Sequence, residues 1–166
     1  MKSLVVYYSH YGNTARLADT LLDALGKRGD ASVDEIRYMD NRQSIFKRIF
    51  YRFFPVLVRL APVKTDLKDY DLLCVGIPVW GGRPSAPVTK YLLLTKDAVG
   101  KKVICFYVYS LEASAKRCSK FIKSLLKKKG FLCVESVFVH WDNIGNDLFL
   151  NKAISEAINK VSSHRA

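Results

Sequence analysis

The chain has 166 residues, 49% of them apolar, and a formal net charge of +12 at pH 7. This length suits one domain with its own core, and we expect residues 1–166 to form a single domain. No run of eighteen uncharged apolar residues is present, and the first residues lack the pattern of a signal peptide, so we expect no clear membrane span and a cytoplasmic location.

Residues 4–25 have the pattern of a strand, a short polar loop and a helix. Residues 4–8 are apolar, β-branched or aromatic, as in a buried strand, and from Ala15 onward apolar residues recur at helical spacing. The loop between them leaves backbone N–H groups unpaired at the positive end of a helix, where phosphates bind. Its residues are Ser9, His10, Tyr11, Gly12, Asn13 and Thr14.

The loop 9–14 leaves two interpretations open. It matches neither G-x-G-x-x-G nor G-x-x-x-x-G-K-[ST], which disfavours a Rossmann dinucleotide site and a P-loop. The loop either binds an anion or uses Asn13 or Thr14 only to cap the helix.

Residues 27–65 include the least regular part of the sequence. We expect the first helix to end at 27–30 and a second strand, near a sheet edge, at 31–38. The segment 41–65 has six basic residues and no acidic one, and its apolar residues recur at helical spacing with a break at Pro55. It is either a crossover helix on the sheet or, over 45–60, an element that docks on an anionic membrane surface or a partner.

The rest of the chain alternates between strand and helix patterns. A near-continuous apolar run predicts a central parallel strand over 70–77, a second buried strand is expected over 102–109, and a fifth strand over 131–140. Helices are expected to start near Val88 and to cover 112–129 and 147–161. For the second of these, the predicted inward face is Ala115, Cys118, Phe121, Ile122 and Leu125. Five strands alternating with helices predict an α/β domain with a parallel sheet.

Four cysteines, at positions 74, 105, 118 and 133, lie far apart, and no C-x-x-C pair is present. Most fall in apolar runs typical of strands. We interpret them as buried free thiols and expect no metal site.

Three loops are expected to meet at the carboxyl ends of the strands, where open α/β sheets bind ligands. The loop 9–14 suits a phosphate. The loop Pro78, Val79, Trp80, Gly81 and Gly82 offers an indole for stacking a flat ring, and glycines that let the backbone approach it. Tyr109 and Ser110 follow the fourth strand, and His140 and Trp141 follow the fifth, where we interpret them as packing at the edge of the site. A phosphate cradle beside an aromatic wall favours a flavin mononucleotide (FMN) site.

YYSHYGNT and YDLLCVGIPVWGGRPSAPV resemble the phosphate loop and the ring-flanking loop of the flavodoxin family and its NAD(P)H-quinone reductase relatives. The resemblance spans nearly the whole chain. It implies a three-layer sandwich with helices on both faces of a five-stranded parallel sheet, whose 2-1-3-4-5 order is taken from the family. It also implies that residues 9–14 surround the FMN phosphate and that residues 78–82 flank the isoalloxazine.

Two features depart from the family pattern. The segment 107–112 lacks the glycine that many relatives carry there, which leaves Tyr109 as the residue to stack on that side. Electron-carrier flavodoxins are typically acidic, whereas this chain is basic. One positive charge about 10 Å from the ring, at an effective dielectric of roughly 40, would favour flavin reduction by about 0.8 kcal/mol, or roughly 35 mV.

We therefore predict an FMN-binding protein that transfers electrons through the flavin. The electrons would be exchanged with an acidic partner protein docked on the basic helix 112–129, or with NAD(P)H and a quinone in a small reductase. The flavin supplies the chemistry, so no catalytic side chain is required, and His10 is expected to bind the phosphate rather than relay protons. Two alternatives remain, a domain of this fold without cofactor and a module that docks on anionic lipid. No nucleic-acid partner is expected, because no recognised reading motif is present.

Overall fold

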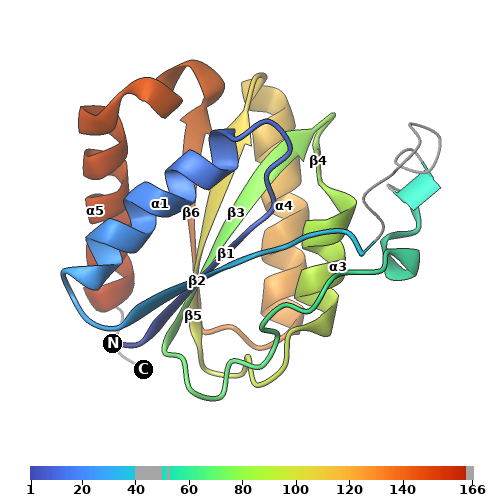
Figure 1. Ribbon diagram of the computed structural model, residues 1–166, viewed down its shortest axis with the longest axis horizontal. Helices are drawn as coiled ribbons and strands as arrows, with labels where there is room; N and C mark the ends of the chain where they lie inside the picture. Colours follow the sequence, from blue (N-terminus) through green and yellow to red (C-terminus); the bar gives the residue numbers. More distant parts are fainter. Residues whose placement is uncertain (40–49, 52, 164–166) are drawn as a thin grey trace.

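The computed structural model describes residues 1–39, 50–51 and 53–163 (Figure 1). The predicted helix over 41–65 therefore lies partly outside the described residues. Within them, residues 50, 51 and 53 are helical, and Pro55–Leu57 form a short 3-10 helix, η1. Residues 58–65 are not helical, so the predicted helix is wrong there. Over the same described ranges, no helix is both long enough and apolar enough to cross a membrane. The cytoplasmic location stays a prediction.

A parallel sheet forms the centre of the molecule. Its strands are β1 (Ser3–Tyr7), β2 (Ala31–Glu35), β3 (Leu72–Trp80), β5 (Lys102–Tyr109) and β6 (Cys133–His140). They are ordered β2-β1-β3-β5-β6, and every neighbouring pair is parallel. This is the 2-1-3-4-5 order predicted from the resemblance, because the remaining strand, β4 (Arg83–Pro84), pairs only with β3 and runs antiparallel to it.

Helices cover both faces of the sheet (Figure 1). One face packs against α1 (Asn13–Gly26) and α5 (Asp147–Ser163), and the other against α3 (Ala86–Leu94) and α4 (Glu112–Lys128). Side chains alternate along each strand, so Val5 and Cys74 point toward α1 and α5 while Leu4 and Val75 point toward α3 and α4. The predicted three-layer sandwich is confirmed.

The structure corrects two local predictions. The predicted loop 78–82 is instead a β-hairpin, because β3 continues through Trp80, which pairs with Arg83. Gly81 and Gly82 form its turn with φ of 55° and 80°, values that two-residue hairpin turns require and glycine adopts without strain. On α4, Phe121 is 44% exposed and Leu126 is fully buried, so the predicted inward face was wrong at Phe121.

Candidate functional site

A cavity of about 270 Å³ opens at the carboxyl ends of β1, β3 and β5. It brings together four segments of the chain, as the parallel topology predicts, and the first two, residues 9–14 and 78–80, are more than sixty residues apart. The lining residues are Ser9, His10, Tyr11, Asn13, Thr14, Pro78, Val79, Trp80, Val108, Tyr109, Ser110 and Trp141.

The first side of the cavity is the N-terminus of α1. Gly12 is the N-cap residue, with φ of 87°, and no side chain among the described residues caps the helix. The interpretation of Asn13 or Thr14 as a simple side-chain cap is therefore wrong. The amide N–H groups of the first helical turn have no partner within the helix, and that turn carries no acidic residue. Their partial positive charge faces a hollow and suits an anion.

Ser9 adds a second, independent sign of an anion at this end. Its Oγ is buried and has no hydrogen-bond partner within the described part of the chain. A buried hydroxyl without a partner has lost its hydrogen bonds to water and gained none in return. Because Ser9 lines the cavity, a phosphate oxygen bound there would satisfy it. The residues at this end fit the phosphate of a mononucleotide.

The second side is formed by Trp80 at the end of β3. Its ring is partly buried and makes edge-to-face contacts with Tyr8 and His10, each with centroids 6.0 Å apart. These contacts orient the indole beside the cavity that Thr14 also lines. Trp80 is thus neither sealed in the interior nor remote from the helix N-terminus, and it offers a flat wall for a ring system.

The third side comes from the ends of β5 and β6. The Nε2–H of His140 donates to the carbonyl oxygen of Ser110 at 3.1 Å, and its ring packs edge-on to Tyr109 with centroids 5.4 Å apart. His140 therefore ties the two strand ends together. The next residue, Trp141, is 53% exposed and lines the cavity.

Three of the predicted site residues do not line the cavity. Gly12 caps α1, while Gly81 and Gly82 form the hairpin turn. Two lining residues were missed, Val108 and Trp141, although Trp141 was placed at the edge of the site. Its position directly after a parallel strand was the available signal, since all such ends meet at one edge of the sheet.

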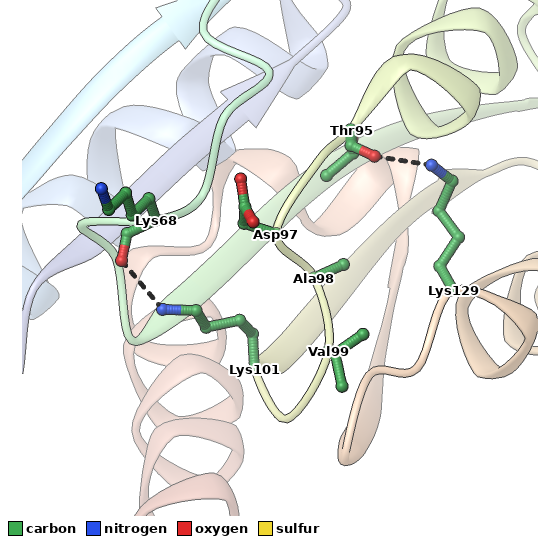
Figure 2. A pocket seen from close by; sticks show the side chains of 7 residues that line it. All are labelled: Lys68, Thr95, Asp97, Ala98, Val99, Lys101 and Lys129. Atoms are coloured by element: carbon green, nitrogen blue, oxygen red, sulfur yellow. Dashed lines mark hydrogen bonds between the residues drawn. The ribbon is translucent and has the colours of Figure 1, made fainter.

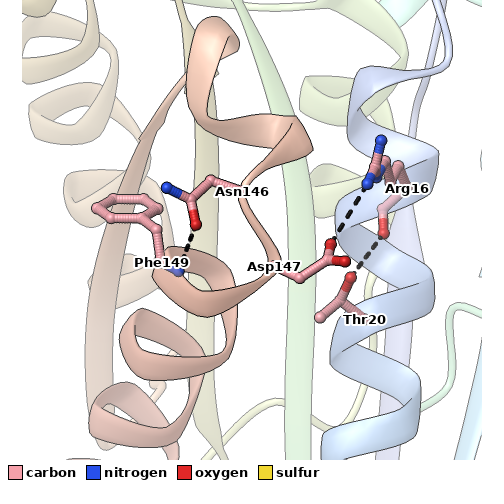
Figure 3. A network of polar contacts seen from close by, with 5 residues as sticks. All are labelled: Arg16, Thr20, Asn146, Asp147 and Phe149. Carbon is pink, nitrogen blue, oxygen red and sulfur yellow. Dashed lines mark hydrogen bonds and ion pairs between the residues drawn. The ribbon is translucent and has the colours of Figure 1, made fainter.

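Polar contacts fix the flank of the site between α1 and α5 (Figure 3). Arg16 forms an ion pair with Asp147 at 3.3 Å, and Thr20 Oγ1 donates to the carbonyl oxygen of Arg16 at 3.1 Å. Asn146 caps α5 by accepting the amide N–H of Phe149 at 3.0 Å. The guanidinium of Arg16 is thereby directed toward α5. At the phosphate end, the partial charge of the helix N-terminus supplies positive charge.

A larger hollow of about 480 Å³ lies at the other end of the sheet and is lined mainly by the loop 95–101 (Figure 2). Two of its three lysines, Lys101 and Lys129, are engaged with the backbone. Lys129 Nζ donates to the carbonyl oxygens of Thr95 at 2.6 Å and Leu93 at 2.9 Å, where α3 ends. Lys101 Nζ donates to the carbonyl oxygen of Lys68 at 3.1 Å. Burial lowers the pKa of Lys129, and these cations serve mainly to hold loops and a helix end in place.

The sequence comparisons find no protein-family model and no curated protein that matches the chain. Solved structures match it over nearly its full length. A candidate flavoprotein from Bacteroides eggerthii superposes with a TM-score of 0.73 at 18% identity, covering 98% of this chain and 99% of that chain.

Two further neighbours have named activities or classes. An apo NADH:FMN oxidoreductase matches with a TM-score of 0.64 at 18% identity, covering 99% of this chain and 92% of that chain. Oxidised flavodoxin 1 from Bacillus cereus matches with a TM-score of 0.61 at 16% identity, covering 99% and 100%. These similarities, with the strand order, show that the chain has the flavodoxin-like α/β fold.

Proposed function

We propose that the chain binds FMN in this cavity and transfers electrons through the bound flavin. The proposal is carried by one observation: a single cavity of about 270 Å³ has a polar end that suits an anion and an aromatic end that suits a flat ring. One end holds the Ser9 hydroxyl, which has no hydrogen-bond partner among the described residues, beside a helix N-terminus, and the other holds the oriented Trp80 indole. A phosphate joined to a flat ring system meets both requirements.

In this proposal the protein binds and orients, while FMN supplies the capacity to accept and donate electrons. Ser9 and the amides of Asn13 and Thr14 would hold the phosphate. Trp80 and Tyr109, on different strands of the cavity wall, would flank the ring. His10 lines the cavity beside Trp80 and would add a hydrogen bond at the phosphate end.

The electron partners separate two versions of the proposal. As a carrier, the protein would dock an acidic redox protein on α4, whose outward residues Lys120, Lys123, Lys127 and Lys128 are exposed. As a reductase, it would admit NAD(P)H and a quinone over the flavin. The rim of the cavity supports this second version, because Tyr11 is 78% and Trp141 is 53% exposed, so a second substrate could approach the flavin from solvent.

The direct test is titration of the purified chain with FMN and, in parallel, with riboflavin, which lacks the phosphate. We expect a yellow complex and tighter binding of FMN than of riboflavin. Stopped-flow mixing of the complex with NADPH and a quinone then separates the versions, since steady turnover without another protein indicates a reductase. Failure to bind either flavin would overturn the proposal and leave the alternative of a domain without cofactor.

A further inference from the structure

A cluster of exposed apolar side chains lies outside α3, at residues 50–57, in the teal segment of Figure 1. We call this cluster the aromatic surface. Its five members are between 49% and 63% exposed, which is unusual for large apolar residues gathered within eight positions. They are Phe50, Phe53, Phe54, Val56 and Leu57.

The segment is fixed to the body of the protein by its other side. Val58 is only 2% exposed, and Lys90 Nζ of α3 donates to the carbonyl oxygen of Val56 at 2.6 Å. Tyr51 stacks on Tyr38 with centroids 6.3 Å apart and an interplanar angle of 23°. The outward direction of the aromatic surface is therefore set by contacts behind it.

Ring contacts extend this anchoring to the candidate site. Tyr38 packs edge-on against Tyr8 with centroids 5.8 Å apart, and Tyr8 contacts Trp80 in the same way at 6.0 Å. On the outer side, Tyr51 contacts Phe50 at 6.2 Å, and Phe50 contacts Phe54 at 5.0 Å. The aromatic surface and the wall of the cavity thus belong to one connected set of rings.

The charge around the aromatic surface is positive. The sequence from 41 to 65 contains six basic residues and no acidic one, and of these Arg59 and Lys64 are exposed in the structure. The acidic groups of neighbouring β2 are engaged locally. Asp34 accepts the amide N–H of Lys64 at 2.8 Å, and Glu35 forms an ion pair with Arg37. A complementary partner would carry negative charge around an apolar interior.

We propose that the aromatic surface docks on an anionic lipid bilayer. Exposed phenylalanine and aliphatic side chains next to lysine and arginine match an interfacial segment, in which the rings enter the headgroup boundary and the cations bind acidic lipids. Protein interfaces also favour phenylalanine and arginine but are depleted in lysine, whereas membrane-surface segments combine lysine and arginine with phenylalanine and leucine, so the charge selects the bilayer as the occupant. The inference does not depend on flavin binding.

The test is co-sedimentation of the full chain, without added flavin, with vesicles of phosphatidylcholine alone or with about 30% phosphatidylglycerol. We expect binding to the anionic vesicles only, and much weaker binding when the salt is raised from about 25 mM to about 500 mM. Phe53→Asp should weaken binding at least about tenfold, because it removes one inserted ring and adds a repelled charge. Arg59→Gln should weaken it about fivefold.

Two matched variants control for general changes in surface character. Leu148→Asp alters a residue of α5 that is 83% exposed, and Lys128→Gln removes an equivalent charge from α4. Both should bind vesicles like the unaltered chain, and all four variants should keep its melting temperature, since each changes an exposed side chain. Absence of binding at low salt, equal binding to neutral vesicles, or equal loss in the control variants would overturn the proposal.

Discussion

The methyl group of Thr14, on the first turn of α1, rests directly on Gly76 in the middle of β3. A Cβ atom placed on Gly76 would lie 2.7 Å from Thr14 Cγ2 and 2.7 Å from Tyr7 Cβ. Thr14 is 2% exposed, so this contact is part of the interior. It sets how closely the helix N-terminus approaches the sheet, and thereby the depth of the anion end of the cavity.

Gly76→Ala should therefore destabilise the protein. Neither neighbour is the free end of a flexible side chain, so β1 or α1 must shift, at a cost of about 1–3 kcal/mol in the free energy of unfolding measured with urea. Gly26→Ala is the matched control, because Gly26 is helical and a Cβ there would meet no described atom within 4 Å beyond its chain neighbours and the backbone of its own helix. It should leave stability unchanged or raise it slightly. Equal destabilisation by both variants would contradict the close packing described.

Ser9→Ala separates a ligand role from a structural one. Because the hydroxyl is buried without a partner among described residues, its removal should leave the stability of the ligand-free protein unchanged or raise it. FMN affinity should fall by about 10- to 100-fold, the effect of one hydrogen bond to a charged group. Riboflavin affinity, measured by the same titration, should not change. An equal loss for both flavins would show that Ser9 does not contact the phosphate.

The intrinsic fluorescence of the protein should report the cavity. The chain has two tryptophans, and both of them, Trp80 and Trp141, line it. Bound FMN should quench the emission of each, which Trp80→Phe and Trp141→Phe resolve one at a time. Trp80→Ala should also weaken FMN binding about tenfold through loss of stacking. Emission that stays constant at saturating FMN would place the flavin elsewhere.

Arg117 on α4 provides a test of the basic charge. A Cβ on Gly82 would meet Arg117 Cδ at 3.1 Å, so this side chain lies over the β3–β4 turn beside the aromatic wall. Arg117→Gln should lower the reduction potential of bound FMN by roughly 35 mV, because the reduced flavin loses a stabilising charge. Lys127→Gln, about 15 Å further along the same helix, should have a much smaller effect. Potentiometric titration of both variants in low salt measures the difference.

The buried cysteines should react slowly in the folded protein. Cys74, Cys105 and Cys118 are fully buried, and burial raises the pKa of Cys105 and of Cys118 to about 12. At pH 8 only about one such thiol in ten thousand is the reactive thiolate. Ellman's reagent should therefore modify at most one of the four cysteines of the native chain rapidly, and all four after unfolding. Rapid modification of two or more would contradict the described core.

The sequence predicted the parallel sheet well because short, continuous apolar runs that alternate with helical patterns are typical of buried parallel strands. The hairpin after Trp80 differs from the predicted loop even though Gly81-Gly82 is a known turn signal, because Pro78 indicates the end of a strand and β3 continues past it. The apolar pattern predicts Phe121 to point inward because helical spacing alone does not distinguish a residue at the border of a buried face from one at its centre.

The sequence predicts which strand ends form the candidate site, but it does not predict the burial of single atoms or the course of the loops that complete the cavity. The residues 9–14 and 78–80 lie at adjacent ends, as topology requires. That the Ser9 hydroxyl is buried without a partner in the described part of the chain depends on the packing around one atom, which no sequence pattern encodes. Trp141 reaches the cavity through the 3-10 turn η2 (Trp141–Gly145), whose course is not evident from composition.

The ring contacts from Trp80 through Tyr8 and Tyr38 to Tyr51 have a photochemical consequence. If FMN binds in the cavity as proposed, electron donation from the adjacent Trp80 indole would quench the fluorescence of the excited flavin. A flavin bound against Trp80 would therefore return to its ground state without emitting light. The complex would be yellow in daylight and nearly invisible under an ultraviolet lamp.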